Sequence, residues 1–452
     1  MIEDKPSRFV TTGSYPARAG NAVRLLIDGE AAFGRICEAI EVARHSVWVT
    51  VTFMWPGVQM PGGRGAPLDV LERAAQRGVD VRVIFWRPDI ETKSLERNAF
   101  WGSPAQLELL RERYPKLSVR WDRAHPGFCQ HQKTWLIDAG GDSECAFVGS
   151  INLNPHSMVA AGHSSEGQNH DVYLELSGTA VADVHHNFVQ RWNEASERHT
   201  PDGCHGERGK LELKFPTALP EQRGSVTVQI QRTTHPNRYR HGPVAVGGVP
   251  FEIARGERTN LEQYLLMIQS AQRTIYIENQ AIEVLEILDA LRRALERGVE
   301  VLLVMPAPRD LLPNVPTAKP HAFATARAAL GGFERFTLAG IAGIGDDGQR
   351  KPVHIHSKLM LVDDTWATVG SANLHRWSLF GNGELNAAIW SPAAVREFRI
   401  SLFSEHLAMD TSGLDDMSAL RAFRTVALEN RRRLAQGNHA WQGLAFSLEP
   451  LR

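Results

Sequence analysis

The chain has 452 residues, of which 43% are hydrophobic and 22% charged, and its 50 Lys and Arg residues against 51 Asp and Glu residues give a net charge of −1. These values exclude an intrinsically disordered chain and suit two or three globular domains. Proteins that live on nucleic acid usually carry a basic excess, so the balanced charge argues against that class, although it does not exclude a local basic patch.

The cysteines Cys37, Cys129, Cys145 and Cys204 form neither a CxxC pair nor a zinc-binding spacing, so we expect free thiols. Spacing alone does not favour a disulfide between Cys129 and Cys145. The polar N-terminus lacks the apolar stretch of a signal peptide, and no apolar run approaches a membrane span. We expect a protein that is cytoplasmic or peripheral at a membrane, and export by a route without a signal peptide stays open.

The first expected elements of the chain recur in its second half. A helical pattern at 33–43 leads into the strand ARHSVWVTV at 43–51, and a helical pattern at 261–271 leads into the strand AQRTIYIE at 271–278. The same order of elements in both places indicates an internal repeat.

The next segments match more closely. LDVLERAAQRGVDV at 68–81 and LDALRRALERGVEV at 288–301 are both amphipathic helices. Each helix ends at a glycine, Gly78 or Gly298, which is typical of a helix C-cap, and a buried strand follows.

The strongest matches are two short motifs. His131–Asp138 is HQKTWLID and His356–Asp363 is HSKLMLVD; VGSINL follows the first at 148–153 and VGSANL follows the second at 369–374. Strands that alternate with helices in both halves predict a duplicated, layered α/β unit.

We divide the chain into four parts on this pattern. The segment after about residue 200 is rich in Pro, Gly, Arg and His and is expected to be a connector with one strand at 226–232. A final helix is expected at 417–433. The predicted parts are a first repeat at 1–200, the connector at 201–248, a second repeat at 249–411, and a C-terminal helix and tail at 412–452.

Side-chain parity along a strand assigns the motif residues to faces. His131 and Lys133 share one face, as do His356 and Lys358. The motif aspartates lie seven residues beyond their histidines and so fall on the opposite face. We expect Asp138 and Asp363 to brace the structure without touching substrate.

A short turn joins each motif strand to the GSxN strand, and pairing Asp363 with Trp366 across it sets a register. The same residue types then face each other in both halves. The predicted cross-strand pairs are Lys358–Ser371 and His356–Asn373 in the second half, and Lys133–Ser150 and His131–Asn152 in the first.

Such a cluster suits a phosphate group, because Lys supplies positive charge while Ser and Asn supply donors. Two clusters that meet would place an imidazole on each side of phosphorus, as in-line displacement requires. Asp171 and Glu384 follow the two GSxN elements at matching places. We predict that they orient the two imidazoles, with surface salt bridges as the alternative.

The sequence does not indicate a metal site, and we expect structural roles for several other histidines. No HExxH motif or clustered acidic set appears, so we expect no metal and no cofactor. We expect His185 and His186 on the surface of a helix at 181–192. Four others are expected to be loop or core histidines and not ligands: His125, His163, His170 and His354.

The duplicated HxKxxxxD motif with GSxN behind it resembles the phospholipase D superfamily, over roughly residues 23 to 407. Three further segments resemble its phosphatidylcholine-hydrolysing and transphosphatidylating branch: IYIENQ at 275–280, VQIQRT at 228–233, and 171–192. Ala281 departs from that branch, which often has Tyr or Phe there.

The resemblance implies a fold and a mechanism. It implies two α-β-α sandwich repeats packed as a pseudo-two-fold bilobal monomer, with the active site between them and no metal. His131 would attack phosphorus to form a phosphohistidine, and His356 would protonate the leaving alcohol and then activate water or an acceptor alcohol. Lys133, Lys358, Asn152 and Asn373 would hold the phosphoryl oxygens. No lipid-binding module precedes the repeats, so calcium dependence is not expected.

The substrate implied first is a glycerophospholipid at a membrane surface, which the enzyme hydrolyses or transphosphatidylates. The apolar segments 53–60 and 376–380 would either dip into the membrane or line the pocket. The alternatives are an endonuclease, which needs a basic groove, and a cardiolipin-synthase-like phosphatidyltransferase, which is expected to carry N-terminal membrane spans. A binding protein without activity conflicts with two intact motifs. The head group and the biological role stay open.

Overall fold

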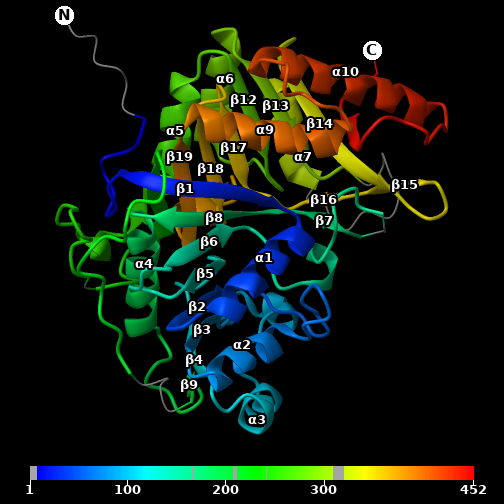
Figure 1. Ribbon diagram of the computed structural model, residues 1–452. Helices are drawn as coiled ribbons and strands as arrows, with labels where there is room; N and C mark the ends of the chain where they lie inside the picture. Colours follow the sequence, from blue (N-terminus) through cyan, green and yellow to red (C-terminus); the bar gives the residue numbers. More distant parts are fainter. Residues whose placement is uncertain (1–7, 165–166, 207–210, 241, 309–319, 452) are drawn as a thin grey trace, which may run out of the picture.

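The computed structural model describes residues 8–164, 167–206, 211–240, 242–308 and 320–451. Figure 1 shows the two halves of the chain as two stacked lobes, the first with α1, α2 and α3 below and the second with α5, α6 and α10 above. Within the described residues, no helix is both long enough and apolar enough to cross a bilayer.

The first half forms a mixed seven-stranded region. Its first three strands in space are mutually parallel, and the others join antiparallel. In spatial order the strands are β4 (Ser118–Asp122), β3 (Asp80–Trp86), β2 (Ser46–Val51), β5 (Thr134–Ile137), β6 (Cys145–Gly149), β8 (Val172–Gly178) and β1 (Arg18–Ile27).

The second half repeats this strand order and the same parallel and antiparallel pairings. The strands are β14 (Phe336–Ile344), β13 (Glu300–Val304), β12 (Thr274–Glu278), β17 (Leu359–Val362), β18 (Trp366–Gly370), β19 (Glu384–Trp390) and β10 (Val226–Thr234). The duplicated α/β architecture expected from the sequence is therefore confirmed.

One sheet runs through both halves because β1 pairs with β10, at Arg18 with Val228 and at Asn21 with Val226. The strand that was expected in the connector is thus β10, which also pairs with β19 along seven residues. Shorter strands extend the edges or bridge the halves: β9 (Cys204–His205), β11 (Glu257–Arg258), β15 (Arg350–Pro352), β20 (Ala445–Ser447), and the cross-half pair β7 (Asn169–His170) and β16 (His354–Ile355).

Helices cover both faces of this sheet because the strands are apolar on both sides. Val47 and Val49 of β2 pack with the helices on one face, while Trp48 stacks on Phe188 of α4 on the other. The helices are α1 (Gly29–Val42), α2 (Pro67–Gln76), α3 (Pro104–Arg113), α4 (Val181–Asn193), α5 (Thr259–Ser270), α6 (Leu285–Glu296), α7 (Pro320–Leu330), α8 (Arg376–Phe380), α9 (Pro392–Leu407) and α10 (Asp416–Ala435), with short 3₁₀ turns at Lys93–Asn98, Pro155–Ser157 and Ile253–Arg255.

The predicted helix ends at Gly78 and Gly298 agree with the structure. Both glycines follow the C-terminal turns of α2 and α6 and adopt left-handed conformations, with φ of 91° and 93°. The cysteines Cys37, Cys129, Cys145 and Cys204 are free thiols, as expected.

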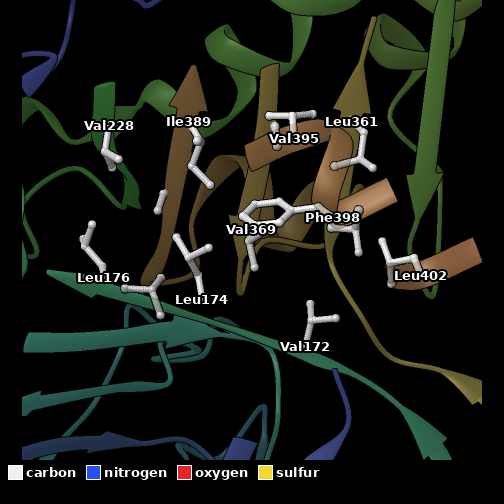
Figure 2. Close-up of a cluster of buried hydrophobic side chains, with 14 of the residues drawn as sticks. Val172, Leu174, Leu176, Val228, Leu361, Val369, Ile389, Val395, Phe398 and Leu402 are labelled. Atoms are coloured by element: carbon white, nitrogen blue, oxygen red, sulfur yellow. The ribbon is translucent and has the colours of Figure 1, made fainter. Parts of the chain in front are cut away.

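A core of apolar side chains lies between the two halves (Figure 2). Val172 and Leu174 of β8, from the first half, face Val369 of β18 and Phe398 of α9, from the second half. The two repeats are therefore joined by a shared core as well as by the continuous sheet.

One prediction about α4 is wrong. His185 and His186 are buried, at 6% and 3% exposure. The Nδ1 atom of His185 lies 3.0 Å from Glu144, and Nε2 of His186 lies 2.8 Å from the carbonyl of Pro243. The helical pattern alone did not show that the segment around Pro243 packs over this helix.

Candidate active site

The two motif histidines lie just before the central strands β5 and β17, at the joint between the halves. The N–H of His131 donates to the carbonyl of Gly383 (2.8 Å), and the N–H of His356 donates to the carbonyl of His170 (2.9 Å). Each histidine is therefore fixed against a segment that the opposite half supplies.

The imidazole–carboxylate pairs are crossed in the same way. Nδ1 of His131 lies 3.0 Å from Glu384 and 3.1 Å from the carbonyl of Ser371, and Nδ1 of His356 lies 2.6 Å from Asp171. A carboxylate on Nδ1 favours the tautomer that leaves Nε2 as the basic nitrogen. The geometry thus supplies two oriented imidazoles, one from each repeat.

The carboxylates are held in turn by hydroxyl groups. Ser371 and Ser378 donate to Glu384 at 2.6 and 2.5 Å, and the amide of Asn382 donates to it at 3.2 Å. Ser150 donates to Asp171 in the first half. The two GSxN serines therefore position the carboxylates.

The predicted strand register is wrong by one residue in both halves. Val362 pairs with Trp366, where Asp363 was expected to, and the N–H of Gly370 donates to the carbonyl of Lys358. In the first half Thr134 pairs with Val148, and Gly149 N–H donates to the carbonyl of Lys133. Each turn is one residue longer than assumed, because Asp138 and Asp363 leave the strand with left-handed φ of 52° and 54° and belong to the turn. Ser150 and Ser371 consequently do not face the lysines.

The two lysines are buried beside their histidines. Lys133 Nζ donates to the carbonyl of His131 (2.7 Å) and to Thr52 (3.4 Å), and Lys358 Nζ donates to the carbonyl of His356. Burial lowers the pKa of Lys133 to about 8, against the opposing charge of Glu384, and the pKa of Lys358 to about 7, against Asp171. Both lysines are therefore closer to losing their proton than an exposed lysine is, and a bound anion would stabilise their charged form.

Burial also lowers the pKa of both imidazoles. Glu384 opposes the fall in the pKa of His131, while Lys133 and Lys358 add to it. The pKa of His356 falls to about 4, because Lys358 and Lys133 add to the burial effect against Asp171. Each lysine acts on the histidine of the other repeat, so the two sets of charges lie close together.

Asn152 and Asn373, which were predicted to hold phosphoryl oxygens, end the two GSxN motifs. The side-chain oxygens of Asn152 and Asn373 are buried and have no hydrogen-bond partner among the described residues. Each asparagine precedes a leucine, Leu153 or Leu374, that bridges to the segment after β2 or β12. The two amide groups therefore occupy equivalent places beside the motif strands.

Asp138 and Asp363 lie at the far ends of their strands. Asp138 accepts the N–H groups of Arg44, His45 and Ser46, at 2.9, 2.7 and 3.3 Å. Asp363 accepts those of the corresponding residues 272, 273 and 274, at 2.9, 2.8 and 2.8 Å. Burial would raise the pKa of Asp138, but these donors and Ser143 bring it below its usual value. Both aspartates fasten the start of the neighbouring strand.

The apolar segments 53–60 and 376–380, which were expected to dip into a membrane or line the pocket, differ in their exposure to solvent. Residues 54–59 line a pocket of about 300 Å³ together with the start of α2 and part of α3. Residues Arg376–Phe380 form α8, in which Ser378 and Leu379 are buried and Trp377 is 49% exposed. The first segment thus lines a pocket, and the second presents one aromatic side chain to solvent.

Sequence reasoning missed several supporting residues. Thr52 contacts Lys133, while Ser378 and Asn382 hold Glu384. None of them belongs to the repeated motifs; Ser378 lies in α8, and Thr52 and Asn382 lie outside helices and strands, so no spacing signal pointed to them.

The comparisons with known proteins agree with this geometry. The family model described as "Cardiolipin synthase, PLD-like domain" matches residues 36–192 and 264–405, and the model "Phospholipase D" matches 153–283. A cardiolipin synthase of Listeria monocytogenes is 25% identical over 86% of this chain and 69% of its own length, and the major cardiolipin synthase ClsA of Bacillus subtilis is 27% identical over the same shares. The solved phosphatidylserine synthase of Haemophilus influenzae has the same fold, with a TM-score of 0.57, 15% identity and 84% of each chain covered.

Proposed function

The chain belongs to the phospholipase D superfamily, and from this membership we propose that it is a phosphatidyltransferase, which moves the phosphatidyl group of a glycerophospholipid to the hydroxyl group of an acceptor. The similarity to proteins named cardiolipin synthases supports transfer over hydrolysis. This reverses the ranking from sequence, which placed hydrolysis first. Hydrolysis is the same chemistry with water as the acceptor.

The observation that carries the proposal is the crossed pair of imidazole–carboxylate contacts, His131 with Glu384 and His356 with Asp171. Two oriented imidazoles at one joint supply a nucleophile and a proton donor for displacement at a single phosphorus atom. A structural role alone does not require two lysines with lowered pKa beside them.

The first step follows from this arrangement. Nε2 of His131 attacks phosphorus, and the bond between phosphorus and the leaving alcohol's oxygen breaks as His356 gives that oxygen a proton. A P–N bond now joins the phosphatidyl group to His131. Burial lowers the pKa of both imidazoles, which suits the nucleophile. The negative charge of a bound phosphodiester favours the proton on His356.

The second step reverses the roles. His356 takes the proton of the acceptor hydroxyl, whose oxygen attacks phosphorus and breaks the P–N bond. Lys133, Lys358, Asn152 and Asn373 hold the non-bridging oxygens through both steps. The assignment of His131 as the nucleophile follows the family resemblance, since the two repeats supply nearly equal groups.

The substrate would reach the site from a bilayer on which the protein sits peripherally. We place the acyl chains toward the exposed Trp377 of α8 because that helix leads directly into the segment that holds His131. Nucleic acid is not an expected partner, given the balanced charge of the chain.

A product assay tests this function. Vesicles of phosphatidylglycerol, phosphatidylethanolamine and phosphatidylcholine are each incubated with the protein, with and without added glycerol, and single-stranded DNA is incubated in parallel. We expect new phosphodiester lipids from acceptor alcohols to exceed phosphatidate, and the DNA to stay intact. His131→Ala should abolish turnover, whereas His125→Ala, in an exposed loop, should not. Phosphatidate as the main product with abundant acceptor would favour hydrolysis, and cleaved DNA would contradict the proposal.

A further inference from the structure

A second group of imidazoles and carboxylates lies buried behind the pair of His356 and Asp171. Its members are Asp28, between β1 and α1, His163, in the loop after residue 158, His170 of β7, and Glu405 of α9. Their side chains are 1%, 0%, 0% and 7% exposed. The proposed transfer reaction uses none of them.

The four ligand atoms form a compact set. Nε2 of His163 lies 3.1 Å from Asp28 and 3.4 Å from Glu405, and Nδ1 of His170 lies 3.1 Å from Asp28. All four atoms lie within 4.8 Å of one another. In a tetrahedral zinc site with bonds of about 2.0–2.1 Å, neighbouring ligand atoms are roughly 3.3 Å apart. The three close contacts have about this length, and the two to Asp28 use different oxygens of its carboxylate, Oδ2 toward His163 and Oδ1 toward His170.

These contacts are not aligned as hydrogen bonds. Nε2 of His163, Nδ1 of His170 and Oδ2 of Asp28 are buried and have no hydrogen-bond partner among the described residues, although nitrogen and oxygen atoms stand close together. Buried polar atoms without partners are rare and costly in native proteins.

The neighbouring group around Glu278 behaves differently. Its carboxylate accepts hydrogen bonds from His170 Nε2 at 3.1 Å, His406 Nε2 at 2.9 Å, Ser357 at 2.6 Å and Tyr276 at 2.5 Å. Glu278 is therefore satisfied by protein donors alone. In the first group, Asp28 Oδ1 and Glu405 Oε1 accept backbone N–H groups from Asp171 and Gly162, and the atoms without a hydrogen-bond partner among the described residues are Asp28 Oδ2, His163 Nε2, His170 Nδ1 and Glu405 Oε2.

We propose that Asp28, His163, His170 and Glu405 bind a divalent transition-metal ion of the zinc class. Two imidazoles and two carboxylates suit such an ion in ligand type, and the two negative charges balance it. Burial lowers the pKa of His163, but Asp28 and Glu405 outweigh this and raise it to about 9, so the ion would displace protons when it binds. His170 donates its other ring N–H to Glu278, which is the arrangement that usually fixes the tautomer of a metal-binding histidine.

The ion would position groups and would not take part in the chemistry. It joins α9 of the second half to three segments of the first. His170 is followed directly by Asp171, and its carbonyl accepts the N–H of His356. The bound ion therefore fixes the joint at which the orienting carboxylate meets its imidazole. His163 and His170 lie seven residues apart, but the carboxylates come from residues 28 and 405, so no spacing motif reveals the set. The sequence-based expectation of no metal rested on that missing motif.

Metal content of the full chain tests the site. The purified protein is stripped with a chelator, dialysed, and titrated with Zn²⁺, while bound metal is counted by mass spectrometry and thermal unfolding is followed. We expect about one Zn²⁺ per chain and a higher melting temperature with the ion. Co²⁺ in its place should give the visible absorption of a tetrahedral site.

Ligand variants locate the ion. Glu405→Gln and His163→Gln should lose the bound metal and the thermal shift, with folding checked by circular dichroism. His406→Gln, from the hydrogen-bonded neighbouring group, and His131→Ala, from the reaction site, should keep both. A wild-type chain that binds no Zn²⁺, or folded ligand variants that bind as much as wild type, would overturn the proposal. These readouts do not depend on turnover, so they stand apart from the test of the proposed function.

Discussion

Nδ1 of His356 lies 2.6 Å from Asp171, a carboxylate that the opposite half of the chain supplies. The equivalent contact, between His131 and Glu384, crosses the joint in the other direction. Neither repeat can therefore orient its own imidazole, and the site forms only when both halves are folded against each other.

Removing the charge of either orienting carboxylate should slow turnover without weakening substrate binding. Asp171→Asn and Glu384→Gln keep the shape but lose the group that fixes the Nδ1–H tautomer, so we expect kcat to fall by about 10²–10⁴. KM should change little at a pH well below the pKa values of Lys133 and Lys358, where both lysines keep their charge. Steady-state kinetics of the two variants beside wild type measure both constants, and an unchanged kcat would show that the carboxylates only hold the loops.

Removing the motif aspartates, in contrast, should lower stability and leave turnover nearly unchanged. Asp138→Ala and Asp363→Ala each leave three backbone N–H groups without their acceptor, so we expect a loss of about 1–3 kcal/mol in the free energy of unfolding. Asn at the same positions keeps an acceptor and tolerates left-handed φ, and should lose less. Urea denaturation gives the stability, and kcat per folded molecule should stay near that of wild type. A large fall in kcat with stability intact would place these residues in the chemistry.

The sequence predicted the duplicated fold well because two repeats with the same periodicity fix the strand order of each half. It also predicted Asp171 and Glu384 from their matching positions. It could not predict that these contacts cross between halves, since pairing across the joint depends on tertiary packing. The register failed by one residue because Asp138 and Asp363 belong to the turns, which are one residue longer than assumed. A one-residue slip moves Ser150 and Ser371 from the lysines to the carboxylates.

The sequence also could not predict the buried group formed by Asp28, His163, His170 and Glu405. His163 and His170 were expected to be loop or core histidines, and both are buried. Their carboxylate neighbours come from residues 28 and 405, far apart in the chain. Only the fold brings them together.

Activity should fall as pH rises above about 7 to 8. Burial lowers the pKa of Lys133 to about 8 and that of Lys358 to about 7, so both lysines lose their charge in the free site over this range. A neutral amine holds a phosphodiester poorly, so kcat/KM should decline through these values. Glu384 raises the pKa of Lys133, and Glu384→Gln should therefore move the decline to lower pH. A profile of kcat/KM for both proteins checks this, and a flat profile up to pH 10, near the usual Lys pKa, would contradict it.

Truncating a side chain in the core between the two halves should lower the free energy of unfolding of the chain. Phe398 of α9 is 3% exposed and packs into the core between the halves. Phe398→Ala should cost about 3–5 kcal/mol in the free energy of unfolding. Urea titration followed by both fluorescence and circular dichroism should show a lower midpoint. Phe9, outside that core, offers a comparison: Phe9→Ala should cost less.

Two exposed apolar side chains near the site should anchor the protein to a bilayer. Ile90 is 88% exposed and Trp377 is 49% exposed. The loop of Ile90 is tied to the segment before His131, because Gly127 N–H donates to Asp89 at 3.1 Å, and the ring of Phe128 in that segment packs on Gly381 just after α8. Both side chains therefore project from elements that contact the segment leading into His131.

The double variant Ile90→Ser and Trp377→Ser removes this apolar area and should weaken binding to vesicles, because the free energy of insertion scales with buried apolar surface. Co-sedimentation with anionic liposomes measures the bound fraction, and turnover of a soluble short-chain substrate should stay near that of wild type. Val42 lies on α1 and is 74% exposed. Val42→Ser is the matched control and should bind vesicles as well as wild type does. If the double variant binds as well as the control, the membrane contact lies elsewhere. Residues 54–59, which line the 300 Å³ pocket, are then the next segment to change.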